Sequence, residues 1–257
     1  MTPQLIDTHC HLYLDIFDLD IPQVIQRAEN EGITKFYLPA IDRSEEKGLL
    51  ALEKKFPGKC LAMMGVHPCS IKENYQEELS WAEKWLQKRG FSGIGETGLD
   101  YYWDKTYIKE QAIAFRKQIE WALHYDLPVI IHSRNSLQDC IDIIRENQNG
   151  KLKGIFHCFS EGYEYAKQIM DLGFYMGIGG VLTYKNSGLA AVVEQIPMEW
   201  IVLETDSPYL TPVPFRGKRN ESSYLKYVVA KLAEVKKIEA LEIGSVTTTN
   251  AQKIFGD

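Results

Sequence analysis

The chain of 257 residues lacks a long hydrophobic run and lacks an excess of positive charge. No apolar stretch reaches the roughly 20 residues that a membrane-spanning helix needs, so we expect no membrane partner. The formal net charge is −6, which argues against a broad basic surface for duplex nucleic acid. This charge leaves open a nucleic acid that is gripped locally by metal ions.

The cysteines are few and unsuited to disulfides. There are five, an odd number, and no two form a CxxC pair, which argues against a disulfide framework or a thiolate zinc knuckle. Cys10, Cys69 and Cys158 each lie within two residues of a histidine. We interpret them as small buried hydrophobic residues beside a site rather than as ligands. No basic segment followed by an apolar signal region opens the chain, so we expect a cytoplasmic protein, and no feature indicates an obligate protein partner.

Short apolar runs alternate with longer amphipathic ones from end to end. Several short runs are nearly continuous in hydrophobicity, which is typical of parallel strands covered by helices. Strands are predicted over residues 4–9, 35–40, 60–68, 91–96, 128–133, 154–159, 174–180 and 200–206.

Helical spacing of apolar residues marks the segments between the strands. Helices are predicted over residues 21–32, 109–128 and 223–238. In the second of these, the apolar face would include Ile113, Phe115 and Ile119.

This alternation predicts an α/β protein, with residues 1–257 forming a single (β/α)8 TIM barrel. No Ser/Gly linker, charge block or low-complexity stretch marks a domain boundary. A doubly wound open sheet is the alternative fold. It fits less well because no glycine-rich dinucleotide turn follows the first strand.

The stretch LIDTHCHLYLD, at residues 5–15, ends an apolar strand on two histidines that bracket a cysteine. Side chains alternate between the faces of a strand, so His9 and His11 point the same way while Cys10 points the opposite way. Two imidazoles are thereby offered to one point in space.

Reacting groups of such a barrel stand at the C-terminal ends of its strands. His124 falls inside a helical pattern, and the other five histidines fall at predicted strand ends together with two carboxylates. The full set is His9, His11, His67, Glu96, His132, His157 and Asp206. Buried polar groups are costly without partners, and the partner that suits this set is a metal ion.

The number of ligands indicates two ions. Four histidines and two carboxylates exceed what one four-coordinate ion needs when positions stay open for water and substrate. One carboxylate that bridges two divalent ions would use the set economically, and the ions could share a hydroxide. The residues alone do not assign the bridge, although Glu96 comes from the strand between the two histidine groups.

At these residues the sequence resembles the TatD family of metal-dependent deoxyribonucleases, within the amidohydrolase-like barrels. The resemblance covers essentially the whole chain in order. It runs through the motifs DTHCH, GVHP, GETGLDYY, IIHSR, HCF, ETDSPYL, RGKRNE and TTNAQKIF.

The resemblance implies how the ligands divide between the ions. The first ion would be held by His9, His11, Glu96 and Asp206, and the second by Glu96, His132 and His157. Glu96 would be the bridge.

Two positions depart from the family pattern. Ser160, Glu161 and Gly162 follow HCF where Ser-Gly is more common, and Ser222 follows RGKRNE where proline is common. Both lie in loops that we expect to shape the substrate cleft.

The resemblance also favours a function, the hydrolysis of DNA phosphodiester bonds by a metal-bridging hydroxide, with single strands trimmed from an end. Asp206 and Glu96 are the predicted catalytic residues, and Asp206 would accept the proton of the attacking water. Substrate contacts are predicted for His67, Arg134, Tyr102, Arg216 and Lys218. Each has an ordinary alternative as a structural hydrogen bond, a rim salt bridge, loop packing or a solvated charge.

The same site chemistry is compatible with a carbonyl hydrolase, such as an amidase, lactonase or ester deacylase. A non-catalytic binding barrel is the third hypothesis, but it should have lost a ligand, and this chain keeps them all. The ions could be Mg, Mn or Zn, since imidazoles suit the transition metals while phosphate chemistry often uses magnesium.

Overall fold

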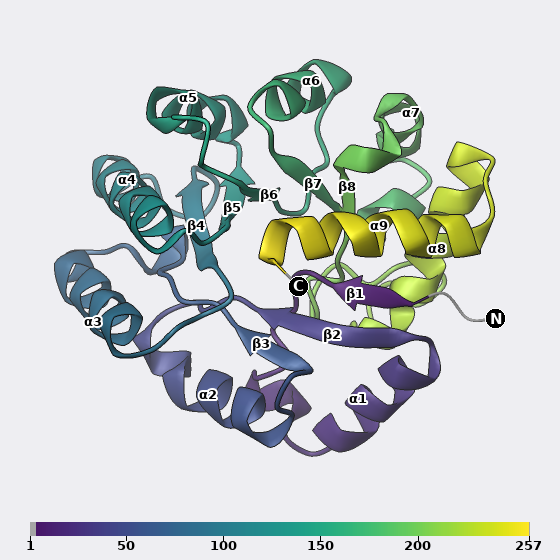
Figure 1. Cartoon of the computed structure of the whole chain (residues 1–257), viewed down its shortest axis with the longest axis horizontal. Helices are drawn as coiled ribbons and strands as arrows, with labels where there is room; N and C mark the ends of the chain where they lie inside the picture. Colours follow the sequence, from purple (N-terminus) through teal and green to yellow (C-terminus); the bar gives the residue numbers. More distant parts are fainter. Residues whose placement is uncertain (1–3, 257) are drawn as a thin grey trace.

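The computed structural model describes residues 4–256 as strands and helices that alternate along the chain (Figure 1). The strands are short and carry parallel neighbours. They are β1 (Leu5–Asp7), β2 (Ile33–Leu38), β3 (Cys60–Ala62), β4 (Ile94–Asp100), β5 (Val129–Arg134), β6 (Gly154–Phe156), β7 (Tyr175–Ile178) and β8 (Ile201–Leu203).

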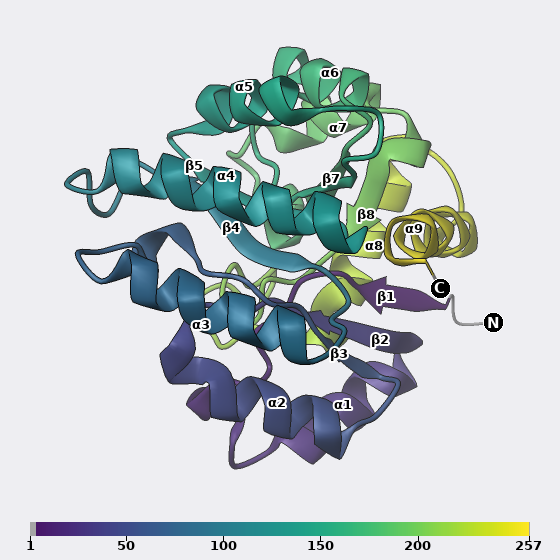
Figure 2. The same cartoon turned by 60° about the vertical axis from the view of Figure 1, so that its left-hand side comes forward.

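Helices surround the strands and alternate with them in sequence (Figures 1 and 2). The α-helices are α1 (Ile21–Asn30), α2 (Glu46–Lys55), α3 (Tyr75–Lys88), α4 (Ile108–Tyr125), α5 (Leu137–Asn147), α6 (Tyr163–Asp171), α7 (Leu189–Gln195), α8 (Leu225–Lys236) and α9 (Ala240–Phe255). Short 3-10 turns are η1 (Asp15–Phe17), η2 (Arg43–Glu45), η3 (Pro68–Ser70), η4 (Gly180–Thr183), η5 (Met198–Trp200) and η6 (Ser222–Tyr224). Within residues 4–256, no helix combines the length and hydrophobicity that crossing a membrane requires.

The strands form two parallel sheets whose edges meet at two seams. The sheets are ordered β1-β2-β3 and β4-β5-β6-β7-β8. At one seam Met64 pairs with Ile94, and at the other Cys10 pairs with Ser207. The amide of His11 donates to the Ser207 carbonyl at 2.7 Å across the second seam. The eight strands thus surround one axis, and the predicted TIM barrel is correct.

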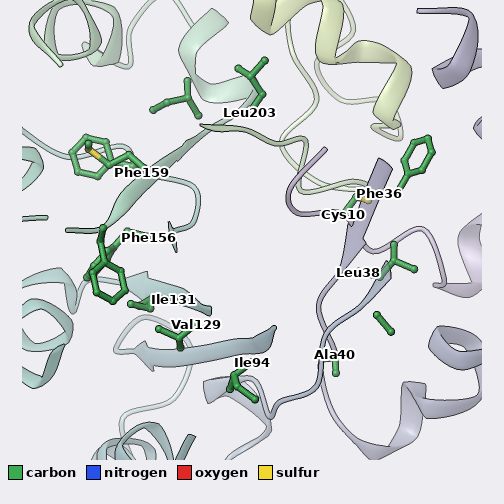
Figure 3. Close-up of a cluster of buried hydrophobic side chains, with 14 of the residues drawn as sticks. Cys10, Phe36, Leu38, Ala40, Ile94, Val129, Ile131, Phe156, Phe159 and Leu203 are labelled. Atoms are coloured by element: carbon green, nitrogen blue, oxygen red, sulfur yellow. The ribbon is translucent and has the colours of Figure 1, made fainter. Parts of the chain in front are cut away.

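Strand periodicity separates the outer core from the barrel interior. Ile130, Ile155 and Val202 belong to the inner apolar cluster. Two positions later in the chain, they are followed by His132, His157 and Glu204, respectively. Because side chains alternate, each apolar interior residue is followed on the same face by a polar residue of the rim. The residues between them pack outward against the helices in the main core (Figure 3).

Helix α9 closes the end of the barrel opposite to the rim. Ala251 and Ile254 join the inner apolar cluster, and the Phe255 ring stacks on Tyr37 with centroids 3.6 Å apart. The buried Asn250 side chain donates to two backbone carbonyls, those of Met198 and Ile201, both at 2.8 Å. This packing explains the TTNAQKIF motif as a structural plug.

Five of the predicted strands extend beyond the observed ones, and those predicted over residues 35–40, 91–96 and 128–133 are shifted along the chain. β4 continues to Asp100, so Glu96 lies within the strand rather than at its end. Between Ile94 and Thr97 the register against β5 shifts by one residue, and this bulge contains Glu96. An extra residue in a strand redirects its side chains.

Two further expectations need correction. β3 ends at Ala62, so His67 lies in the following loop rather than at a strand end. The prediction that Ile113 lies on the buried face of α4 is wrong, because Ile113 is 53% exposed while Phe115 and Ile119 are buried. Phe115 and Ile119 belong to the buried face of α4.

We predict that Asn250→Ala lowers the free energy of unfolding by about 2–4 kcal/mol, because the buried carbonyls of Met198 and Ile201 lose their donor. Denaturant unfolding followed by circular dichroism measures this change. The control is Thr249→Ala, an exposed neighbour on the same helix, which should stay within about 0.5 kcal/mol of the parent. An equal loss in both variants would refute the assigned role of Asn250.

Candidate metal centre

Asp7 ties the end of β1 to the segment after β8. Its carboxylate accepts hydrogen bonds from the Thr205 amide at 2.9 Å, the Thr205 hydroxyl at 2.6 Å and the Ser222 hydroxyl at 2.6 Å. Burial raises the pKa of Asp7 to about 6 against the opposing effect of these hydrogen bonds. The HxH motif therefore starts from a fixed point beside the loop that carries Asp206.

Ser222 is buried and does not shape the cleft, contrary to the expectation from its loop position. Its hydroxyl is used in the bond to Asp7. The serine at this position thus supports the scaffold of the site. The other departure, around Ser160, does reach the cavity, because Ser160 is among the residues that line it.

One group of ligand atoms is assembled around one oxygen of Glu96. His9 Nε2 lies 3.1 Å and His11 Nε2 lies 3.4 Å from Glu96 Oε2. The two imidazole nitrogens are 3.2 Å apart, and Asp206 Oδ1 lies 3.6 Å from His9 Nε2 and 3.5 Å from His11 Nε2. Residues after β1, within β4 and after β8 thus come together in this group.

These spacings fit a bound cation. Ligand atoms about 2.0–2.1 Å from a tetrahedral ion lie about 3.3–3.4 Å from one another. In the first group, the separations that involve His9 or His11 run from 3.1 to 3.6 Å. Neutral imidazoles and carboxylates are also the donors that divalent transition metals take. This first group could hold an ion with little rearrangement.

A second group of imidazoles surrounds the other oxygen of Glu96. Glu96 Oε1 lies 2.9 Å from His132 Nδ1, 3.2 Å from His157 Nε2 and 3.3 Å from His67 Nε2. The ring centroids of His132 and His157 are 5.9 Å apart. His132 lies nearer to His67, at 4.5 Å. The second group is therefore less completely gathered than the first.

The far nitrogen of several imidazoles faces an acceptor that sets which nitrogen carries the proton. His132 Nε2 is 2.9 Å from Asp100 Oδ2, and His157 Nδ1 is 3.2 Å from Glu204 Oε1. A carboxylate there accepts the N–H, so the nitrogen that faces Glu96 is the one that a cation would bind in place of a proton. Burial lowers the pKa of both rings, but the neighbouring carboxylates raise it above its ordinary value. Within residues 4–256, His9 Nδ1 is buried without a hydrogen-bond partner, so His9 has no such orienting group.

Tyr13 orients His11 in the same sense. Its hydroxyl donates to the Pro39 carbonyl at 2.6 Å and lies 2.9 Å from His11 Nδ1. Since the hydroxyl proton is used on Pro39, the hydroxyl oxygen accepts from His11 Nδ1. His11 Nε2 is then free to bind a cation.

His67 is oriented in the opposite sense. Its Nδ1 accepts a hydrogen bond from the Cys69 amide at 3.1 Å, so in the neutral ring the proton is on Nε2. Burial lowers the pKa of His67 and so favours the neutral ring, although the charge of Glu96 acts in the opposite direction. His67 therefore points an N–H, rather than a lone pair, toward Glu96. The structure favours His67 as a hydrogen-bond donor over a ligand.

Without a metal, the site holds several buried ionisable groups whose charges shift one another's pKa values. Burial raises the pKa of Glu96, but the charges of His67, His157 and His9 outweigh it and hold that pKa well below its ordinary value. Burial likewise raises the pKa of Asp206, and the hydrogen bond from His11 leads the effects that lower it overall. Burial lowers the pKa of His11, yet Asp206 and Glu96 raise it to about 9. Both carboxylates are thus ionised at neutral pH.

The centre opens into a cavity of about 720 Å³. Seven of the predicted site residues line it, namely His11, His67, Glu96, His132, Arg134, His157 and Asp206. The predicted contact residue Tyr102 is outside the lining, whereas its neighbour Trp103 is part of it. Asp206 and Cys158, both in the lining, have φ values of 55° and 51°, a left-handed conformation that is uncommon for residues other than glycine and often marks functional sites.

The predicted basic cluster lies outside the cavity lining. Arg216 stacks over the Tyr184 ring at 4.2 Å, and Lys218 lies 5.5 Å from the Phe215 ring. Arg219, which follows Lys218, pairs with Asp20 through two bonds of 2.8 and 2.7 Å. Arg219 therefore holds two loops together, while Arg216 and Lys218 remain exposed on the surface.

The sequence did not identify several residues that the structure brings to the site. Asp100, Glu204 and Tyr13 orient imidazoles, and Tyr209 lines the cavity. Glu204 carried a usable signal, because it follows β8 directly, two residues beyond the interior residue Val202 and two residues before Asp206. Asp100 carried none, because β4 was expected to end at Glu96.

The barrel, together with the imidazoles and carboxylates at its rim, defines a metal-dependent hydrolase. A model of the family described as TatD related DNase matches residues 6–256, and the chain belongs to this family.

Relatives cover the chain almost completely. "Uncharacterized metal-dependent hydrolase YabD" from Bacillus subtilis (strain 168) is 38% identical over 252 residues, which is 98% of each chain. "Uncharacterized metal-dependent hydrolase YcfH" from Escherichia coli (strain K12) is 32% identical, covering 98% of this chain and 95% of the relative. The crystal structure of YjjV, a TatD homologue from Escherichia coli K12, has a TM-score of 0.93 at 28% identity and covers 100% of both chains.

We predict that a divalent cation binds the metal-free protein more tightly as the pH rises from about 6 to 9. His11, with its pKa of about 9, is protonated over most of this range, and a cation must displace that proton. Calorimetric titration with Zn²⁺ or Mn²⁺ in buffers of different ionisation enthalpy measures the protons released. Release of no proton at pH 7 would contradict the prediction.

Proposed function

We propose that this chain hydrolyses phosphodiester bonds of DNA, acting on single strands from an end. The observation that carries the proposal is one buried carboxylate, Glu96, with imidazoles on both of its oxygens at the floor of an open cavity. The description of the matched family, TatD related DNase, supports DNA as the substrate.

The proposed ligands are those that the family resemblance implied. His9, His11, Glu96 and Asp206 would hold one divalent ion, and Glu96, His132 and His157 would hold a second, with Mg, Mn or Zn as candidates. When bound, such ions lower the pKa of an attacking water and stabilise charge on phosphate oxygens.

Asp206 is the proposed proton acceptor. Its side chain is 15% exposed, compared with 4% for Glu96, so it is the carboxylate of the centre that is more accessible from the cavity. Its lowered pKa keeps it ionised at neutral pH and able to take a proton from water. Glu96, enclosed by imidazoles, would hold its charge in place throughout the reaction.

His67 and Arg134 are the proposed phosphate contacts. The N–H on His67 Nε2 faces the cavity floor and can donate to an anionic oxygen. Arg134 is exposed at the cavity wall and offers a planar set of donors that matches phosphate oxygens. The proposed roles of Arg216 and Lys218 are more distant contacts with the strand, outside the cavity.

A time course on end-labelled single-stranded DNA, with Mg²⁺ or Mn²⁺ added, tests the proposal. We expect a ladder that shortens stepwise, and we expect Asp206→Ala to slow it by about 10²–10⁴-fold because the proton acceptor is lost. Full activity of Asp206→Ala would show that Asp206 is not the proton acceptor. Intact DNA from protein that demonstrably carries metal would favour carbonyl hydrolysis instead.

A matched pair of variants separates a donor from a ligand. We predict that His67→Ala lowers the rate of DNA cleavage but keeps the bound metal, whereas His132→Ala loses about one ion per chain. The reason is that the Cys69 amide donates to His67 Nδ1, which places the proton of the neutral ring on Nε2, whereas Asp100 accepts from His132 Nε2 and leaves Nδ1 as the nitrogen that would bind a cation. Elemental analysis of the purified variants measures metal content, and loss of metal from His67→Ala would show that His67 is a ligand.

A further inference from the structure

Asp100 links two parts of the molecule through its two carboxylate oxygens. Oδ2 accepts from His132 Nε2 at 2.9 Å, and Oδ1 accepts from the backbone amides of Tyr102 and Trp103 at 2.9 and 3.1 Å. Gln111 from α4 holds the Asp100 backbone, accepting from its amide at 2.9 Å. The side chain is 1% exposed. A single buried group therefore fixes both an imidazole of the metal centre and the start of the following loop.

That loop carries two exposed aromatic rings beside an arginine, a group that we call the aromatic platform (Tyr102, Trp103 and Arg134). Trp103 is 68% exposed and Tyr102 is 52% exposed. Their ring centroids are 4.9 Å apart at 86°, and the Arg134 guanidinium carbon lies 4.1 Å from the Tyr102 centroid and 5.4 Å from that of Trp103. Large aromatic side chains exposed beside a cavity leave area for a ligand to cover.

Arg134 is positioned by these rings rather than by an acid. Across residues 4–256, its guanidinium forms no ion pair. Its N–H groups are therefore free for an anion, while Trp103 offers a flat face in the lining of the same cavity. A flat apolar face next to an unpaired guanidinium suits a nucleotide, which combines an aromatic base with a phosphate.

We propose that Trp103 stacks on an unpaired base next to the phosphate being cleaved, and that Asp100 is the positioning residue that sets this platform relative to the metal centre. The proposal rests on the proposed function and specifies how a single strand is chosen. A base within a duplex is already stacked on its neighbours and must leave the stack before it can reach Trp103.

The first experiment crosses a protein change with a substrate change. Oligothymidylate is compared with the same strand carrying abasic tetrahydrofuran sites at its terminal nucleotides, and kcat/KM is measured for the parent and for Trp103→Ala. We expect the parent to prefer the base-carrying strand about tenfold and Trp103→Ala to lose that preference, while Trp103→Phe keeps most of it. An unchanged preference in Trp103→Ala would overturn the proposal.

Binding without turnover keeps this test independent of the proposed function. Fluorescence anisotropy of the same two labelled strands, with chelator present, measures affinity for the metal-free protein. We expect Trp103→Ala to weaken binding of the base-carrying strand to the level of the abasic strand. Failure of the parent to cleave DNA, with base-dependent binding intact, would reject the nuclease but retain the platform. Cleavage that does not depend on the base would support the nuclease but reject the platform.

Two substitutions at Asp100 separate its two roles. In Asp100→Asn the amide oxygen can still accept from the Tyr102 and Trp103 amides, but the amide nitrogen donates to His132 Nε2. The His132 proton then moves to Nδ1, which faces Glu96. We expect Asp100→Asn to bind Zn²⁺ about 10–100-fold more weakly at one site while keeping base-dependent binding of DNA.

Asp100→Ala should lose both properties, because the loop amides lose their acceptor as well. Calorimetric titration with Zn²⁺ measures the metal sites, anisotropy measures the base preference, and thermal unfolding confirms that each variant is folded. If Asp100→Ala retains the base preference of the parent, Asp100 does not position the platform. If Asp100→Asn loses both the base preference and the metal, the substitution disturbs the rim as a whole, and the two separate roles proposed for Asp100 are rejected.

Discussion

The buried carboxylate of Glu96 is the constraint on which the rest of the site depends. Its residue is 3% exposed, and imidazoles approach both of its oxygens at distances of 2.9–3.4 Å. An ionised carboxylate in such surroundings is costly unless positive charge compensates it. The compensation comes from histidines that lie on or follow β1, β5 and β6 and from His67 in the loop after β3, so the barrel must bring these segments to one point. The bulge in β4 is the local device that turns Glu96 into that point.

What each histidine can do is decided by the partner of its far nitrogen. His132 and His67 both face Glu96 Oε1, at 2.9 and 3.3 Å, and residue type alone does not distinguish them. Asp100 accepts from the far nitrogen of His132, while the Cys69 amide donates to that of His67. One ring is thereby prepared to bind a cation and the other to donate a hydrogen bond. Partners one step away from the centre therefore decide which role each imidazole can take.

The sequence predicted the barrel and the identity of the clustered residues because both follow from strand periodicity. His132 and His157 lie two positions beyond the interior residues Ile130 and Ile155, as regular alternation requires. Prediction failed where the backbone departs from that regularity. Glu96 was placed at a strand end because a bulge has no periodic signature, and the same error hid Asp100, four residues further along β4. Trp103 lines the cavity and its neighbour Tyr102 does not, because the loop geometry decides this and strand alternation does not predict it.

The two ends of the barrel divide stability from chemistry. At one end α9 fills the interior with apolar side chains, and Asn250 saturates buried carbonyls without any group that could react. At the other end buried charges, a fully buried His9 Nδ1 that lacks a partner among the described residues, and left-handed φ values at Asp206 and Cys158 are gathered together. Such features raise the free energy of the folded state. They are tolerable at the rim because the interior beneath it is densely apolar, and a bound cation would relieve part of the cost.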